Sequence, residues 1–120
     1  MEVVQSMSIE LFLLEYLQTA LNTTAVYLLV PETKPSEFFV VDKLGSTTED
    51  KITTAHVAIQ SWGSSVLDAL AKNETVKSVM LDDLIEEKEI ASVRLNSDYP
   101  YHDTSTKHPR YQAVFDIVHY

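Results

Sequence analysis

Two histidines and two aspartates fall close together near the end of the chain, and they are the first group whose side chains could do chemistry. His102 and Asp103 are adjacent, His108 follows within the same polar stretch, and Asp98 precedes them. Imidazole nitrogens and carboxylate oxygens are both metal ligands, but this spacing matches no metal-binding motif. Such groups are also common in polar loops that bind nothing. We therefore expect a polar hairpin loop here, with no metal and no cofactor.

A pair of serines follows a glycine in the middle of the chain. Ser64 and Ser65 come directly after Gly63, but the sequence has no Gly-x-Ser-x-Gly motif and no His/Asp pair with an arguable role. A serine before a helical stretch is a good N-cap, because its hydroxyl accepts a hydrogen bond from a free backbone N–H. We expect these serines to cap a helix, and we predict no catalytic residue and no enzymatic activity.

Five carboxylates gather in one short stretch, here called the acidic cluster: Asp82, Asp83, Glu86, Glu87 and Glu89. Paired carboxylates can hydrolyse glycosides, but that reaction needs a cleft that raises the pKa of one of them. We expect a solvated helix end instead. Negative charge at a helix C-terminus opposes the helix dipole, so a basic partner surface or a wide water-filled channel would relieve the repulsion.

The aromatic residues admit two readings. Trp62 is the single tryptophan, and it fits either a core position between two elements, which we favour, or a binding anchor. Four tyrosines gather near the end of the chain, and they suit cross-strand packing or an interface equally well. These are Tyr99, Tyr101, Tyr111 and Tyr120.

Composition excludes several classes of function. The 120 residues predict a single α+β domain over 1–120, and the net charge of −9 has the wrong sign for a basic nucleic-acid surface. There is no cysteine, and two glycines are too few for a P-loop or a dinucleotide fingerprint. The longest apolar runs are too short to cross a bilayer, and the first residues lack the positive start of a signal peptide. We expect an intracellular product with no membrane address.

Hydrophobic periodicity predicts two helices and five strands in the order α-β-β-β-α-β-β. The first helix is expected over 3–21, with Val4, Met7, Leu11, Leu14, Leu17 and Leu21 on its apolar stripe. The second is expected over 66–87, with a kink near 73–75. Strands are expected over 25–30, 38–44, 51–61, 89–101 and 110–120, separated by a proline loop at 31–35, a long polar connection at 45–50 and a loop at 103–109. Both helices should cover one face of a mainly antiparallel sheet.

Several sequence patches together resemble a known group of proteins. They include Leu95-Asn96-Ser97-Asp98-Tyr99, Asp103-Thr104-Ser105-Thr106-Lys107 and Arg110-Tyr111-Gln112-Ala113-Val114-Phe115-Asp116-Ile117-Val118, and earlier Val30-Pro31, Phe39-Val40-Val41 and Ala58-Ile59-Gln60-Ser61-Trp62. The pattern, which covers nearly the whole chain, is similar to small neck and tail-completion proteins, or tail terminators, of long-tailed bacteriophages and prophages of Gram-positive bacteria.

The resemblance implies a virion structural subunit without enzymatic activity. Such a subunit is made in the bacterial host cytoplasm and forms a homo-hexameric ring in the tail or neck of the virion. The ring caps the tail tube protein, stops its polymerisation and mediates head-tail joining through the head connector or adaptor protein. DNA would pass through the ring without specific binding, past an acidic lumen that repels phosphates.

Loops make the subunit and tube contacts in such rings. We therefore expect contacts in 31–37, 45–51 and 101–109. The residues expected in the interface are Pro31, Glu32, Lys34, Pro35, Tyr101, His102, Asp103, Lys107 and His108. The acidic cluster is expected to face the lumen or a basic partner.

A second reading comes from the charge alone. An acidic monomeric or dimeric protein-binding module, like an immunity protein or an antitoxin, would use the same net charge to match a basic partner. Oligomeric state separates the two readings, because only the first requires a closed ring.

Overall fold

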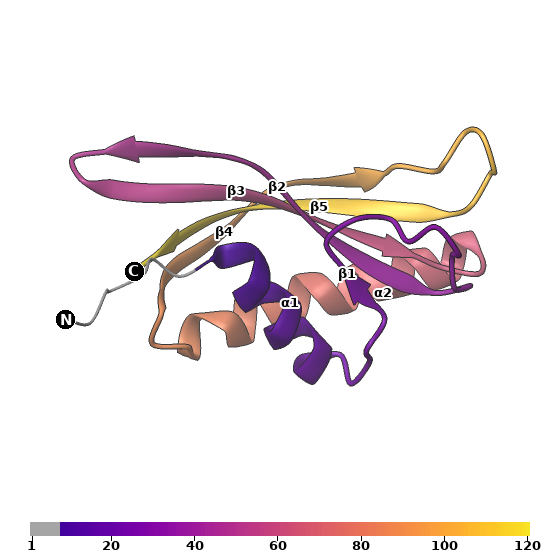
Figure 1. Cartoon of the computed structure of the whole chain (residues 1–120), viewed down its shortest axis with the longest axis horizontal. Helices are drawn as coiled ribbons and strands as arrows, with labels where there is room; N and C mark the ends of the chain where they lie inside the picture. The colour runs from indigo at the N-terminus through magenta and orange to yellow at the C-terminus, as the bar shows by residue number, and fades with distance from the viewer. Residues whose placement is uncertain (1–7) are drawn as a thin grey trace.

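The computed structural model describes residues 8–120 as an α+β fold, which confirms the expected class. In chain order the elements are α1 (Ile9–Ala20), β1 (Val26–Tyr27), β2 (Phe38–Glu49), β3 (Ile52–Trp62), α2 (Val66–Ser78), η1 (Val79–Asp83), η2 (Leu84–Glu86), β4 (Ile90–Pro100) and β5 (Arg110–His119). The strands form one five-stranded sheet in the order β1-β2-β3-β5-β4, and both helices lie on one side of it (Figure 1).

The sheet is mixed, which corrects the expectation of a mainly antiparallel sheet. The short strand β1 runs parallel to β2, with Val26 opposite Phe39, whereas the β2/β3, β3/β5 and β4/β5 pairs are antiparallel. The loop between β1 and β2 returns the chain to the end where β1 began, so both strands run in the same direction. A parallel pair needs such a long return, and the two-proline loop supplies it.

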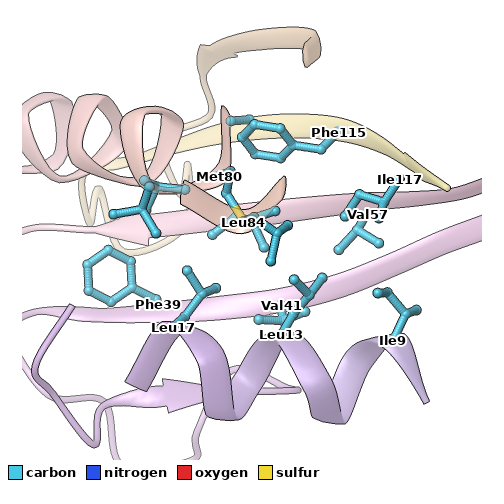
Figure 2. Close-up of a cluster of buried hydrophobic side chains, with 14 of the residues drawn as sticks. Ile9, Leu13, Leu17, Phe39, Val41, Val57, Met80, Leu84, Phe115 and Ile117 are labelled. Atoms are coloured by element: carbon cyan, nitrogen blue, oxygen red, sulfur yellow. The ribbon is translucent and has the colours of Figure 1, made fainter. Parts of the chain in front are cut away.

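The core lies between the sheet and the helices (Figure 2). From α1 it takes Ile9, Leu13 and Leu17, which recur every four residues. The predicted stripe is confirmed at Leu17 and is otherwise rotated. Leu11 is 52% exposed, Leu14 and Leu21 are only partly buried, and Val4 and Met7 lie outside the described residues. The helix ends where expected, because Asn22 takes a positive φ of 52°.

The second helical segment is not one continuous helix. The helix α2 runs without a break through residues 73–75, where the kink was predicted, and ends at Ser78. The chain then continues as η1, a π turn, and η2, a 3-10 turn. Val66 and Leu67 are exposed, while Asn73 is fully buried and donates to Asp98 Oδ1 at 3.4 Å. Tertiary packing has overridden the apolar pattern here, because the β4 carboxylate gives a buried amide a partner.

The β2–β3 connection is a tight hairpin, not the long loop predicted for residues 45–50. β2 continues to Glu49, which pairs with Ile52, and Asp50 and Lys51 form the turn with φ values of 51° and 67°. Two successive positive φ values are the mark of a type I′ turn, which matches the twist of the strands. Conversely, the strand predicted at 25–30 is limited to β1, and Leu29 is 81% exposed.

The described chain is elongated, with extents of 48 × 29 × 25 Å. The β2–β3 turn and the β4–β5 loop project at opposite ends of the sheet (Figure 1). No helix within residues 8–120 is long and apolar enough to span a membrane.

Candidate functional site

Two of the three predicted contact loops meet at one end of the sheet. Lys34 Nζ, in the loop before β2, lies 3.5 Å from Asp103 Oδ2, in the β4–β5 loop. His108 Nε2 lies 3.3 Å from the Ser36 carbonyl oxygen, which joins the same two loops. The third loop, at the β2–β3 turn, is at the opposite end and takes no part (Figure 1). The structure therefore assembles one composite surface from segments 31–37 and 101–109.

Trp62 is the floor of this surface. It is only 1% exposed, its ring stacks on Phe38 at 4.9 Å between centroids, and its indole N–H donates to Gln60 Oε1 at 3.1 Å. A buried indole with its N–H satisfied is a core residue. The core reading favoured by the sequence is therefore confirmed.

Cationic side chains cover the Trp62 ring. The guanidinium carbon of Arg110 lies 4.6 Å from the Trp62 ring centre and 4.3 Å from the Tyr101 ring centre, so it is held between two aromatic rings. Lys34 Nζ is 5.4 Å from the Trp62 ring centre, and the His108 ring contacts the indole edge-on at 5.0 Å. We call Lys34, Trp62, Tyr101, His108 and Arg110 the Trp62 cluster. The contacts of Arg110 and Lys34 with these rings are favourable cation–π interactions.

Asp103 organises the β4–β5 loop from within. Its carboxylate accepts from the Ser105 hydroxyl at 2.7 Å, from the Ser105 N–H at 3.0 Å and from the Thr106 hydroxyl at 2.8 Å. These hydrogen bonds, the Ser105 hydroxyl first, hold the pKa of Asp103 far below its usual range. His102 Nδ1 accepts from the Arg110 backbone N–H at 3.2 Å. The polar hairpin loop predicted here is confirmed.

Asp98 is separated from these loop residues by its own contacts. It accepts from Lys77 Nζ at 3.3 Å and from the Asn73 amide, both on α2. In residues 8–120 no three His, Cys, Asp or Glu side chains are grouped as metal ligands.

Of the two serines predicted to cap α2, Ser65 is the N-cap, and Ser64 precedes it and bonds to Asp68. Ser65 Oγ accepts from the Asp68 N–H at 3.0 Å, and the Asp68 carboxylate accepts from the Ser64 N–H at 2.9 Å. A hydrogen bond from Lys72 is the main reason that the pKa of Asp68 falls to about 2. Gly63 is required before this cap, since a Cβ there would collide with the Ala69 backbone.

The acidic cluster lies at the other end of the molecule, in and after η1 and η2. Ile90, which follows the cluster, begins β4 and pairs with His119. Pro100, at the other end of β4, pairs with Tyr111, next to Arg110. Asp82 accepts from Ser78 Oγ at 3.1 Å, but none of the cluster's carboxylates has an ion-pair partner among the described residues. Burial, followed by the charges of Asp83 and Glu87, raises the pKa of Tyr16 on α1.

The last strands place the tyrosines in different settings. Tyr99 contacts Tyr101 edge-on at 6.0 Å, and its hydroxyl accepts from Gln112 Nε2 at 2.6 Å. Tyr111 contacts the His102 ring at 5.8 Å. Tyr120 is 81% exposed. The first three therefore serve packing within the hairpin.

Two features of the sheet were not predicted from the sequence. Arg110 was not among the predicted contacts, although its place at the start of a strand beside an aromatic-rich segment was a usable signal. A His56–Asp116 pair was also missed, with Nδ1 and Oδ1 2.7 Å apart and Thr47 Oγ1 3.4 Å from Nε2. Burial would raise the pKa of Asp116, but hydrogen bonds from His56 and Asn96 outweigh it, and the pKa is lowered.

We compared the chain with known families, curated proteins and solved structures. No family model and no curated protein matches the chain. A chain of a solved structure titled "Virion of native gene transfer agent (GTA) particle" superposes with a TM-score of 0.55 at 15% identity, over 84% of this chain and 82% of that one. At this identity the likeness shows a shared fold.

Proposed function

We propose that this chain is a structural protein of a phage-type virion, a tail terminator or tail-completion protein that forms a ring at the head-proximal end of the tail tube. The observation that carries the proposal is the fold likeness to a chain of a gene transfer agent virion, because it extends over most of both chains. The sequence patches that resemble tail-completion proteins support the same role independently.

The shape of the described chain is suited to assembly. Segments 31–37 and 101–109 form one projecting surface at one end, and the β2–β3 turn projects at the other (Figure 1). Two different surfaces at opposite ends allow head-to-tail contacts between copies, which close into a ring when the rotation between copies permits. We propose a homo-hexamer that contacts the tail tube protein and the head connector, and a role that requires no chemical reaction.

The acidic cluster fits this role in one of two places. Its carboxylates crowd without ion-pair partners in the described chain, so solvent or a basic partner must screen them. Facing the lumen, they would repel the phosphates of passing DNA and favour sliding over binding.

Electron microscopy of the purified chain, alone and mixed with tail tubes from the same phage or prophage, tests the proposal. Closed rings, or density capping one end of the tubes, are expected. A chain that stays monomeric or dimeric at high concentration and leaves tube ends bare would contradict it. That result would favour the acidic binding module, whose partner would carry a basic surface.

A further inference from the structure

We propose that Arg110 is a positioning residue that locks the two loops of the candidate surface together. The inference deepens the proposed function, because it says how that surface is held ready for a partner. It rests on the proposed function only for the assembly measurement described below.

Arg110 holds the β4–β5 loop from inside. Its guanidinium lies between the rings of Trp62 and Tyr101, and its Nε–H donates to the Tyr101 carbonyl oxygen. Its backbone N–H donates to His102 Nδ1 at 3.2 Å, and its carbonyl accepts from the Tyr101 N–H at 2.9 Å. One residue therefore fixes both the start of the loop and its aromatic floor.

The loop before β2 is tied to the same floor. Lys34 contacts both Asp103 in the β4–β5 loop and the Trp62 ring. The Ser36 carbonyl oxygen lies against His108, whose ring contacts the rings of Trp62 and Phe38 edge-on. The Gly63 N–H donates to the Pro109 carbonyl at 3.1 Å, which anchors the far side of the β4–β5 loop. Both loops contact the Trp62 ring, so we expect a change at Arg110 that moves this ring to affect residues 31–37.

This arrangement divides seven of the nine predicted contact residues into two sets, and the partly buried Pro31 and Pro35 belong to neither. Lys34, Tyr101, His102, Asp103 and His108 make contacts within the surface. Glu32 and Lys107 are exposed, and Lys107 sits at a positive φ of 57°. The first set and Arg110 shape the surface, which leaves the second set to meet a partner.

The test uses Trp62 emission, because the chain has no other tryptophan. Arg110→Ala is compared with Arg110→Lys, and with two controls: Lys107→Ala, a cation of the same loop outside the cluster, and Arg94→Ala, an exposed arginine on the neighbouring strand. Emission, quenching by acrylamide and amide hydrogen exchange of segment 31–37 are measured on each folded variant. Self-association is measured by sedimentation.

Arg110→Ala is expected to shift Trp62 emission to the red and to speed exchange in 31–37. Arg110→Lys keeps the charge but loses the flat guanidinium, so it should resemble the alanine variant. Self-association should weaken about tenfold in both, because the loops must be ordered on binding. Lys107→Ala should weaken association without moving Trp62 emission, and Arg94→Ala should leave emission and exchange unchanged.

Unchanged exchange in 31–37 for Arg110→Ala would overturn the inference, as would a wild-type response from Arg110→Lys. An equal emission shift from Lys107→Ala would overturn it too. A wild-type chain that never associates would contradict the proposed function alone, because emission and exchange still decide the role of Arg110 in the isolated chain.

Discussion

The two ends of the molecule treat their charged groups in opposite ways. At the Trp62 end, cations and a carboxylate make contacts with rings, hydroxyls and backbone groups. At the acidic end, five carboxylates lie together at a helical terminus. One of them accepts a hydrogen bond from a serine hydroxyl, and none of the five forms an ion pair with a described residue. The polar groups of the Trp62 end bond to one another and fix its shape. Those of the acidic end are left to interact with solvent or a partner.

Sequence changes at the Trp62 end should therefore alter folding, whereas changes at the acidic end should alter only association. Buried or internally bonded groups contribute to the free energy of unfolding, whereas solvated carboxylates contribute little to it. Substitutions at the two ends should therefore differ in their effect on the free energy of unfolding.

Truncating the floor of the Trp62 end should have the largest effect. Trp62→Ala removes a fully buried ring together with the stacking partner of Arg110 and Phe38. We expect a loss of about 3–5 kcal/mol in the free energy of unfolding, measured by urea denaturation. Leu67→Ala is the control, because Leu67 is 76% exposed at the start of α2. Similar losses from both variants would contradict the assignment of Trp62 to the core.

Lowering the pH should weaken the Trp62 end through Asp68. Its pKa is about 2 in the folded chain against an ordinary value of 3.8, so its stabilisation is complete above pH 4 and is lost as the pH falls through 2. Because Asp68 is partly exposed to solvent, we expect about 1 kcal/mol. The difference in unfolding free energy between wild type and Asp68→Asn should shrink by this amount between pH 5 and pH 2.

Replacing residues 103–107 with a short Gly/Ser turn should separate function from folding. The segment is polar and bonds mainly to itself, so the unfolding free energy should change by no more than about 1 kcal/mol. Ring formation or phage assembly should suffer far more, because the surface loses one of its two loops. Normal assembly of the replaced chain would rule out a functional role for this loop.

Reversing charge in the acidic cluster should have the smallest effect on stability. Changing Asp82, Asp83 and Glu86 to Lys removes repulsion at a helical C-terminus, so the free energy of unfolding, measured by urea denaturation, should stay constant or rise by about 0.5 kcal/mol at most. Cluster residues that face a lumen should slow DNA ejection when reversed and leave head joining intact. Cluster residues that face a basic partner should abolish joining when reversed. Unchanged behaviour in both assays would identify a merely solvated helix end.

Part of the candidate site could be predicted from sequence because its signals are local. The two prolines at 31–35 and the polar residues at 103–109 marked both loops, and the serines marked the start of α2. Their meeting at Trp62 could not be predicted, because it depends on β1 running parallel to β2 and on the β1–β2 loop reaching the β4–β5 loop. Arg110 was missed because Trp62 lies far from it in the sequence, at the end of β3, and only the pairing of β3 with β5 brings the two residues together.

Local sequence signals were enough for the α+β class, the cap of α2, the end of α1 and the two loops at 31–35 and 103–109. These follow from the backbone preferences of a few neighbouring residues. Only the tertiary structure decided the rotation of α1, the mixed sheet, the tight Asp50-Lys51 turn and the joining of the two loops. The physical reason is that Leu11 and Leu13 have the same affinity for a core, and only the arrangement of the sheet determines which one is buried.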